Sequence, residues 1–176
     1  MSLIRHAGLV LSPWRNGAGR KADIAVGPGW LIGFAFLDAD APFSDYSGHD
    51  RTITLVDGPG FTLAGPGREP LVVNEPAAPA AFDGAWLADC TIHGAPCMVL
   101  NAMTERTRWR HQVEILRGAI PPLPEPAIAE VLVVLAGDLR LGTETLRRRD
   151  AIRLDGSATP QASAEAVLCR LSVFRV

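Results

Sequence analysis

The sequence predicts an all-β protein made of two similar antiparallel modules, and three observations support this. Runs of roughly four to eight apolar and β-branched residues recur between clusters of Gly, Pro and Asp, as is typical of strands joined by tight turns. The 17 glycines and 14 prolines interrupt most windows that are long enough for a helix. One strand–turn–strand pattern occurs twice at a long offset, which indicates a duplicated module.

The expected strands follow one another along the chain. The clearest are residues 30–37, 52–56, 131–135 and 167–173. Residues 40–50 and 126–131 are the two places where a short helix is compatible with the sequence, although helical periodicity is weak in both.

The repeat consists of residues 53–63 and 133–141, each an apolar strand, a glycine-bearing turn and a second strand that ends in Leu. Two small antiparallel barrels or sandwiches, or one barrel with a packed second sheet, would fit this pattern. Closure of a sheet leaves a cavity at its mouth. The proline-rich segment 116–130 is the expected connection between the two modules. We therefore predict a first domain at residues 1–115, which holds the ligand pocket, and a second domain at residues 116–176, with an approximate boundary that strands are able to cross.

Composition and charge narrow the range of functions. The chain is 48% hydrophobic and 20% charged with a net charge of −2, so neither a nucleic acid nor an anionic membrane is an expected partner. No signal peptide and no apolar run of about 20 residues is evident, which favours the cytoplasm. Cys90, Cys97 and Cys169 have spacings that fit neither a disulfide framework nor a zinc site.

The sequence carries no pattern for a metal or a cofactor. His6, His49, His93 and His111 lie far apart in the sequence, whereas clustered imidazoles mark sites for zinc or iron. Gly-x-Ser-x-Gly and Walker-type phosphate loops are also absent from the sequence. We therefore expect no metal, no cofactor and no nucleophilic catalysis.

The most informative segment is residues 12–19, which places an aromatic, a cation and an amide before a turn of small residues. Trp14 offers stacking area, Arg15 a planar fork of donors suited to a carboxylate, and Asn16 both a donor and an acceptor. Gly17 lets the backbone approach a neighbour closely. These residues fit one wall of a polar ligand site, or an N-terminal strand that simply ends in a turn.

A second segment contains Ser44, His49 and Arg51. Arg51 opens an expected strand, so it lies at a rim or points inward, where an unpaired charge is costly. Either an acid such as Asp50 or Asp23 pairs with Arg51, or a ligand anion does, and a structural Asp–Arg bridge is the simpler alternative. His49 is either a hydrogen-bonded loop residue or part of the site.

A third segment places Asn101 and Met103 on the same face of one strand, because side chains alternate along a strand. An inward Asn101 needs hydrogen-bond partners, which nearby backbone or a ligand in the cavity could supply. Arg106 and the alternating arginines that follow it fit a solvated face.

These segments, in this order and spacing, resemble the HutD/Ves family. Its members read approximately Pro-Trp-Lys-Asn-Gly-Gly-Gly, then Gly-Pro-Phe-Ser with Pro-Gly-x-Asp-Arg, then Phe-x-Gly, then Asp-Phe-Asn-x-Met. The counterparts here are residues 13–19, 42–51, 82–84 and 99–106. The resemblance implies a bicupin, which is two cupin-like antiparallel β-barrels or sandwiches in one chain with few short helices.

The resemblance also implies a cytoplasmic bacterial protein without a clear catalytic activity. The family is associated with histidine utilisation, where it is thought to bind urocanate, formiminoglutamate or formylglutamate, and other members are linked to stress. Here Arg15 replaces the family's Lys and Ala18 replaces a Gly. Leu31, Gly33 and Val99 stand where the family commonly has polar residues, so the pocket is expected to accept a different or less charged ligand.

Our leading hypothesis is a non-enzymatic protein that binds a small carboxylate and regulates histidine utilisation or a stress response, with a homodimer as a further expectation. The residues expected to bind the ligand are Trp14, Arg15, Asn16, Gly17, Ser44, His49, Arg51, Asn101 and Met103. The alternative is a metal-free isomerase or lyase that acts on a small organic acid. It requires a proton-transfer residue facing the cavity, for which His49 and Asp23 are the candidates.

Overall fold

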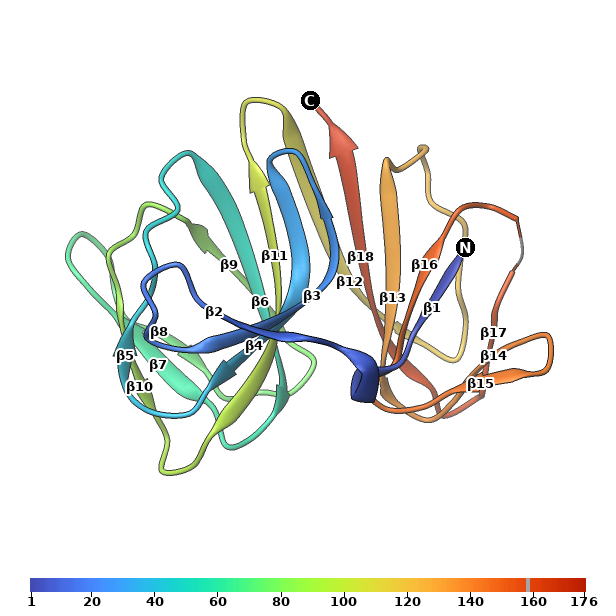
Figure 1. The fold of residues 1–176 in the computed structure, drawn as a ribbon, viewed down its shortest axis with the longest axis horizontal. Helices are drawn as coiled ribbons and strands as arrows, with labels where there is room; N and C mark the ends of the chain where they lie inside the picture. Colours follow the sequence, from blue (N-terminus) through green and yellow to red (C-terminus); the bar gives the residue numbers. More distant parts are fainter. Residues whose placement is uncertain (158) are drawn as a thin grey trace. The chain divides into compact units, whose positions relative to one another are not determined.

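The computed structural model describes residues 1–157 and 159–176, and the fold is all-β, as the sequence predicts (Figure 1). Its helical content among these residues is one short 3₁₀ turn, η1 (His6–Gly8). Residues 40–50 and 126–131, where a short helix is expected, contain strand and turn instead. The described residues form no helix long and apolar enough to cross a membrane.

The chain divides into two compact units, one formed by Val10–Arg108 and the other by Met1–Leu9 together with Trp109–Val176. This grouping differs from the predicted boundary between residues 115 and 116, which falls inside strand β12 (Trp109–Arg117). The physical reason is strand pairing. β12 pairs with the last strand of the chain along its whole length, and the first strand pairs with β16.

The unit at Val10–Arg108 contains two antiparallel sheets. The six-stranded sheet has the order β2 (Leu11–Pro13), β3 (Arg20–Gly27), β4 (Trp30–Leu37), β11 (Cys97–Glu105), β6 (His49–Asp57) and β9 (Pro79–Asp83). The four-stranded sheet has the order β5 (Ala41–Pro42), β10 (Asp89–Ile92), β7 (Phe61–Ala64) and β8 (Leu71–Val73).

These two sheets share one apolar core. Leu37 and Leu55 of the larger sheet and Phe61 and Leu63 of the smaller sheet are all fully buried in the same cluster. Their alternating positions place one face of each sheet inward, which is the pattern that drives two-layer packing. Among the described residues neither sheet closes on itself, so the closed barrels expected from the sequence are not found.

The other unit repeats this plan with fewer strands. Its five-stranded sheet has the order β1 (Ser2–Ile4), β16 (Ala151–Leu154), β13 (Ala129–Ala136), β18 (Val167–Arg175) and β12. Its three-stranded sheet has the order β15 (Glu144–Leu146), β14 (Leu139–Leu141) and β17 (Gln161–Ala162). One buried apolar cluster joins the two sheets, and it includes Leu132, Leu139, Leu146 and Leu168.

The repeat seen in the sequence has a structural counterpart. Residues 53–63 run from β6 in the six-stranded sheet to β7 in the four-stranded sheet, and residues 133–141 run from β13 to β14 in the same way. In both units the glycine-bearing turn therefore carries the chain from the larger sheet to the smaller one.

Gly60 in the first of these turns is expected to be essential for stability. It has a φ of 105°, and a Cβ there would lie 2.4 Å from the carbonyl oxygen of Val73. The variant Gly60→Ala should lose about 2 kcal/mol of unfolding free energy, measured by urea denaturation.

Gly67→Ala is the matched control. Gly67 also has a positive φ, but no neighbouring atom lies within 4 Å of the position that a Cβ would take there, so only the backbone cost of about 1 kcal/mol applies. Equal losses for the two variants would contradict the close approach at Gly60.

Candidate functional site

The site is built on one face of the six-stranded sheet, where β4, β11 and β6 lie side by side. Strand register sets Met103 opposite Arg51 on one side and Leu31 on the other, and sets Asn101 opposite Ile53. Because side chains alternate along a strand, these residues project from the same face. The shared face predicted for Asn101 and Met103 is thus confirmed, and Arg51 points inward rather than lying on the rim.

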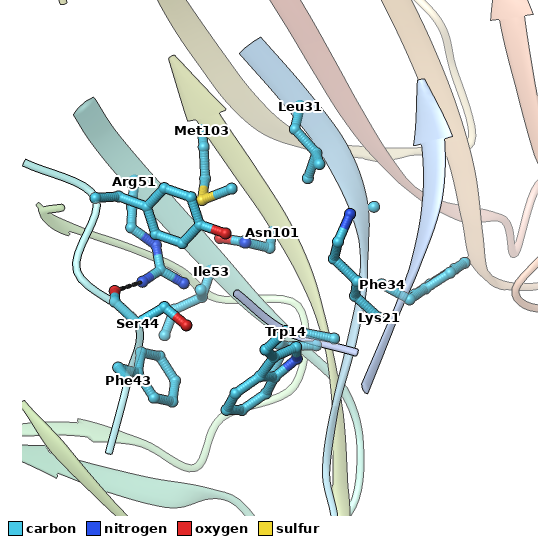
Figure 2. A pocket seen from close by; sticks show the side chains of 14 residues that line it. Trp14, Lys21, Leu31, Phe34, Phe43, Ser44, Arg51, Ile53, Asn101 and Met103 are labelled. Atoms are coloured by element: carbon cyan, nitrogen blue, oxygen red, sulfur yellow. Dashed lines mark hydrogen bonds between the residues drawn. The ribbon is translucent and has the colours of Figure 1, made fainter. Parts of the chain in front are cut away.

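A second wall comes from the loop after β5 and from the start of the turn that follows β2. Phe43, Ser44 and Tyr46 belong to the loop, and Trp14 packs edge-on against Phe43. Figure 2 shows Trp14, Ser44, Arg51 and Asn101 around one hollow. The full lining is Trp14, Lys21, Leu31, Gly33, Phe34, Ala35, Phe43, Ser44, Tyr46, Arg51, Ile53, Val99, Asn101 and Met103.

The hollow is partly open to solvent. Its empty space is about 480 Å³ when the part open to solvent is included. The interior volume left for water-sized molecules is about 30 Å³, which is room for roughly two waters. The interior therefore suits a small polar group rather than a whole large metabolite.

Arg51 is the central charged group of this hollow. Its side chain is only 7% exposed, and its guanidinium carbon lies 5.2 Å from the Phe43 ring centre, 5.3 Å from Tyr46 and 4.9 Å from Phe82. Within the described residues its guanidinium makes one hydrogen bond, a long one from Nη1 to the Ser44 carbonyl at 3.5 Å. Burial lowers the pKa of Arg51 to about 10, so the group still carries its charge at neutral pH.

The acids expected as partners of Arg51 are engaged elsewhere. Asp50 pairs with Arg106 at 3.0 Å, and Asp23 pairs with Lys21 at 2.6 Å. Among the described residues no carboxylate lies within salt-bridge distance of Arg51. The structural Asp–Arg bridge offered by the sequence is therefore wrong, and Arg51 is a buried cation without an acid.

Three buried polar atoms around the hollow have no hydrogen-bond partner among the described protein atoms. They are Arg51 Nε, Ser44 Oγ and Asn101 Oδ1, and each belongs to a residue that is 7% exposed. Buried polar atoms are nearly always paired in proteins. Three such atoms converging from β6, β11 and the β5–β6 loop form a set of donors and an acceptor suited to a small polar ligand.

Three of the positions that depart from the family pattern, Leu31, Gly33 and Val99, line this hollow. Gly33 faces a bulge in β3, and a Cβ there would lie 2.6 Å from the carbonyl oxygen of Ala22. Asn101 lies opposite Gly33 on the neighbouring strand, so it is a polar group among these apolar positions.

Of the predicted ligand-binding residues, five line the hollow and four do not. Those that line it are Trp14, Ser44, Arg51, Asn101 and Met103. Arg15 and Asn16 line a separate outer groove that also includes Ser44. Gly17 lies in the exposed turn between β2 and β3, and its N–H donates to the carbonyl of Trp14.

Asn16 and His49 serve the fold in this structure. Asn16 donates from Nδ2 to the Pro42 carbonyl at 2.9 Å and accepts the Ala18 N–H at 3.1 Å, so it ties the β2–β3 turn to β5. His49 lies outside the hollow, with Nδ1 3.3 Å from the Ser47 carbonyl. Tyr46 and Phe43 were missed by the sequence analysis, although both lie in the segment that contains Ser44 and Arg51.

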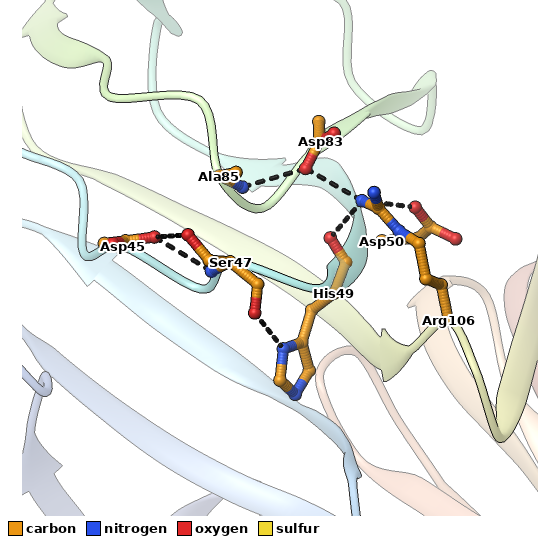
Figure 3. A network of polar contacts seen from close by, with 7 residues as sticks. All are labelled: Asp45, Ser47, His49, Asp50, Asp83, Ala85 and Arg106. Carbon is orange, nitrogen blue, oxygen red and sulfur yellow. Dashed lines mark hydrogen bonds and ion pairs between the residues drawn. The ribbon is translucent and has the colours of Figure 1, made fainter.

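An ion-pair network fixes the strand ends beside Arg51 (Figure 3). Arg106 contacts the His49 carbonyl at 3.0 Å, Asp83 at 2.8 Å and Asp50 at 3.0 Å. It lowers the pKa of Asp83 below its ordinary value through this hydrogen bond. The solvated face predicted for Arg106 agrees with its side chain, which is 40% exposed, and from this exposed position Arg106 joins β6 to β9 one position away from Arg51 and Phe82.

The other unit contains a second buried arginine that does have acids. Arg170 is 2% exposed, donates from Nε to Glu114 at 2.8 Å and lies 3.8 Å from Glu130. Burial raises the pKa of Glu130. This arginine is fully compensated inside its own unit, in contrast to Arg51.

The fold and the site together define an all-β, cupin-like protein with a small hollow around a buried cation. The chain belongs to the HutD family, whose model matches residues 7–169.

Named relatives agree with this membership. A Pseudomonas putida protein named "Uncharacterized 21.2 kDa protein in hutC 3'region" is 27% identical over 89% of this chain and 88% of its own length. Protein Ves of Cronobacter sakazakii is 34% identical over 58% of this chain and 59% of its own.

Solved structures support the fold. HutD from Pseudomonas fluorescens SBW25, in a formate condition, aligns with a TM-score of 0.84 at 23% identity, covering 99% of this chain and 98% of that one. A cupin 2 conserved barrel domain protein from Leptotrichia buccalis aligns with a TM-score of 0.62 at 10% identity, covering 99% and 96%.

The Arg106 network is expected to contribute to stability in a pH-dependent way. Arg106→Met should lower the unfolding free energy only slightly near neutral pH, because exposed ion pairs contribute little individually. The depressed pKa of Asp83 means that its contribution is present above pH of about 4 and is lost as the pH falls further. The difference between wild type and variant, measured by urea denaturation, should therefore shrink between pH 6 and pH 3.

Arg108→Met provides the control for this series. Arg108 is more exposed than Arg106 and pairs with Glu105 within one turn at 3.3 Å. Its replacement should change the unfolding free energy by less than about 0.5 kcal/mol. A pH-independent loss for Arg106→Met would show that its interaction with the acids is not the cause.

Proposed function

We propose that this protein is a non-enzymatic small-molecule receptor whose hollow takes the carboxylate group of an organic acid. The observation that carries the proposal is the buried charge of Arg51, which has no acid partner among the described residues and lies beside Ser44 and Asn101 atoms that are likewise unpartnered there. A buried charge is costly unless it is paired. A bound carboxylate would offset that cost and would match the planar donor fork of arginine.

The dimensions of the hollow support a small head group. An interior of about 30 Å³ suits a small head group such as a carboxylate, and the part of the hollow that is open to solvent leaves room for the remainder of the molecule. Leu31, Val99 and Met103 offer apolar contact, and Ser44 and Asn101 can orient the head group by hydrogen bonds.

The chemistry of the lining favours binding over catalysis. The hollow is lined by neither histidine nor carboxylate within the described chain. His49 and Asp23, the two proton-transfer candidates for a metal-free isomerase or lyase, are both outside the lining. Lys21 does line the hollow, but its Nζ is held by Asp23 at 2.6 Å.

The cellular role that we propose is regulation of histidine utilisation by a carboxylate metabolite in the cytoplasm. Membership of the HutD family supports this role, as does the relative named for its position beside hutC. We also propose that the two units are paired cupin modules of one bicupin. The equivalent crossings from β6 to β7 and from β13 to β14 support this arrangement.

Small carboxylates are expected to stabilise the protein against heat. Formate, acetate and propionate should raise Tm in a concentration-dependent manner, because a ligand that binds only the native state adds its binding free energy to stability. Acetamide and sodium chloride at equal ionic strength are the controls and should have no such effect. An equal shift with chloride would contradict a carboxylate site.

Replacing Arg51 should separate binding from stability. Arg51→Met removes the carboxylate response, yet the unfolding free energy should change by less than about 1 kcal/mol, because the lost ring contacts are offset by removal of an uncompensated buried charge. The measurement is urea denaturation together with the thermal-shift titration.

Arg170→Met is the matched variant. It leaves Glu114 and Glu130 without their cation and should cost about 3 kcal/mol. Destabilisation of similar size in both variants would show that Arg51 is a structural residue, and the proposal would fail.

A further inference from the structure

We infer that the unit formed by Met1–Leu9 and Trp109–Val176 binds a small organic amine, whose ammonium group is held by Glu130. This site is separate from the hollow around Arg51 and does not depend on the function proposed for that hollow. Its starting point is the internal repeat, because the two units place residues of opposite charge at the same position of their larger sheets.

The equivalence of the two positions follows from a bulge that both units share. The pairing of β6 with β11 skips Val56, and the pairing of β13 with β18 skips Leu135. Arg51 precedes Val56 by five residues, and Glu130 precedes Leu135 by the same five. Leu132, two residues after Glu130, belongs to the buried cluster that joins the sheets of its unit. Because side chains alternate along a strand, Glu130 faces this interior, as Arg51 faces its own.

The charges around Glu130 leave an excess of negative charge. Arg170 is 2% exposed and contacts two carboxylates, that of Glu114 at 2.6 Å and that of Glu130 at 3.8 Å. One guanidinium therefore faces two acids and lies much closer to Glu114. Burial raises the pKa of Glu130, which shows that the ionised form is costly in this position. A bound cation would offset that cost.

An unpartnered hydroxyl lies next to Glu130. Ser172 is directly opposite Glu130 in the pairing of β13 with β18, so the two side chains leave the same face of the sheet with their Cβ atoms about 5 Å apart. Ser172 is 1% exposed, and its Oγ has no hydrogen-bond partner among the described atoms. Buried polar atoms are nearly always paired. A primary ammonium group has three N–H donors, enough for the Glu130 carboxylate and the Ser172 oxygen together.

Glu130 also borders a space that is large enough for a ligand. The side chain is 21% exposed and lines an open hollow of about 690 Å³. Leu123, Ile128 and Leu154 line the same hollow. These side chains offer apolar contact to a hydrocarbon stem, which an organic amine has and an inorganic cation lacks.

Two further carboxylates in the lining are already engaged in close ion pairs. Glu125 pairs with Arg110, and Asp155 pairs with the amino group of Met1. Glu130 is thus the carboxylate of this lining with the longest ion-pair distance. It is the group that gains most from an added ammonium ion.

The test is isothermal titration of the full chain with butylammonium chloride near neutral pH and at matched ionic strength. Butylammonium should bind at least about tenfold more tightly than 1-butanol, which has the same stem without the charge. It should exceed butyltrimethylammonium by a similar factor, because that ion has the charge without an N–H donor. Magnesium chloride should not displace butylammonium.

Four variants make the test specific. Glu130→Gln should weaken butylammonium binding at least about tenfold, and Ser172→Ala should weaken it about threefold or more. Arg153→Met removes a positive charge from the lining and should strengthen binding up to about fivefold. Glu165→Gln is the matched control, because Glu165 is an exposed acid of the same unit outside this lining, and it should bind as the wild type does.

The outcomes separate an amine site from its alternatives. Butylammonium that fails to bind, or binds no better than 1-butanol, overturns the inference. Unchanged binding in Glu130→Gln does the same, and displacement by magnesium shows an inorganic cation site instead. Urea denaturation checks the folding of each variant. If Glu130→Gln does not fold, the comparison of the three butyl compounds and the gain in Arg153→Met decide, and the absence of either overturns the inference.

Discussion

The site depends on one electrostatic constraint, a buried guanidinium that no acid in the described part of the chain neutralises. Arg51 is surrounded by the rings of Phe43, Tyr46 and Phe82, whose faces attract a cation but do not cancel its charge. Burial lowers its pKa, yet the side chain remains protonated. This buried positive charge determines the kind of ligand that the hollow can hold.

Two arginines in one chain illustrate opposite solutions to the same physical problem. Arg170 is buried among Glu114, Glu130 and the Pro121 carbonyl, so its unit needs no further anion there. Arg51 occupies a strand in the other unit where both nearby acids are taken by other cations. Arg170 is therefore part of a structural ion pair, whereas Arg51 lies in a candidate receptor site because Arg106 and Lys21 bind the two nearby aspartates.

The sequence predicted the face of β11 correctly because alternation along a strand is a local property, so Asn101 and Met103 had to point the same way. It predicted an inward Arg51 as one of two outcomes. It did not predict that the Asn16 amide donates to the Pro42 carbonyl or that Arg106 pairs with Asp50 and Asp83. These partners lie in segments distant in the sequence, and a single sequence holds no signal for such pairings.

The sequence by itself determined the all-β class, the repeated strand–turn–strand module and the residue types available for an anion site, since these depend on local periodicity and turn chemistry. Only the tertiary structure decided that the sheets stay open, that the chain ends join the second unit, and that Asp50 and Asp23 bind bases other than Arg51. The physical reason is that long-range strand pairing sets which charges meet, and neither composition nor spacing encodes those distances.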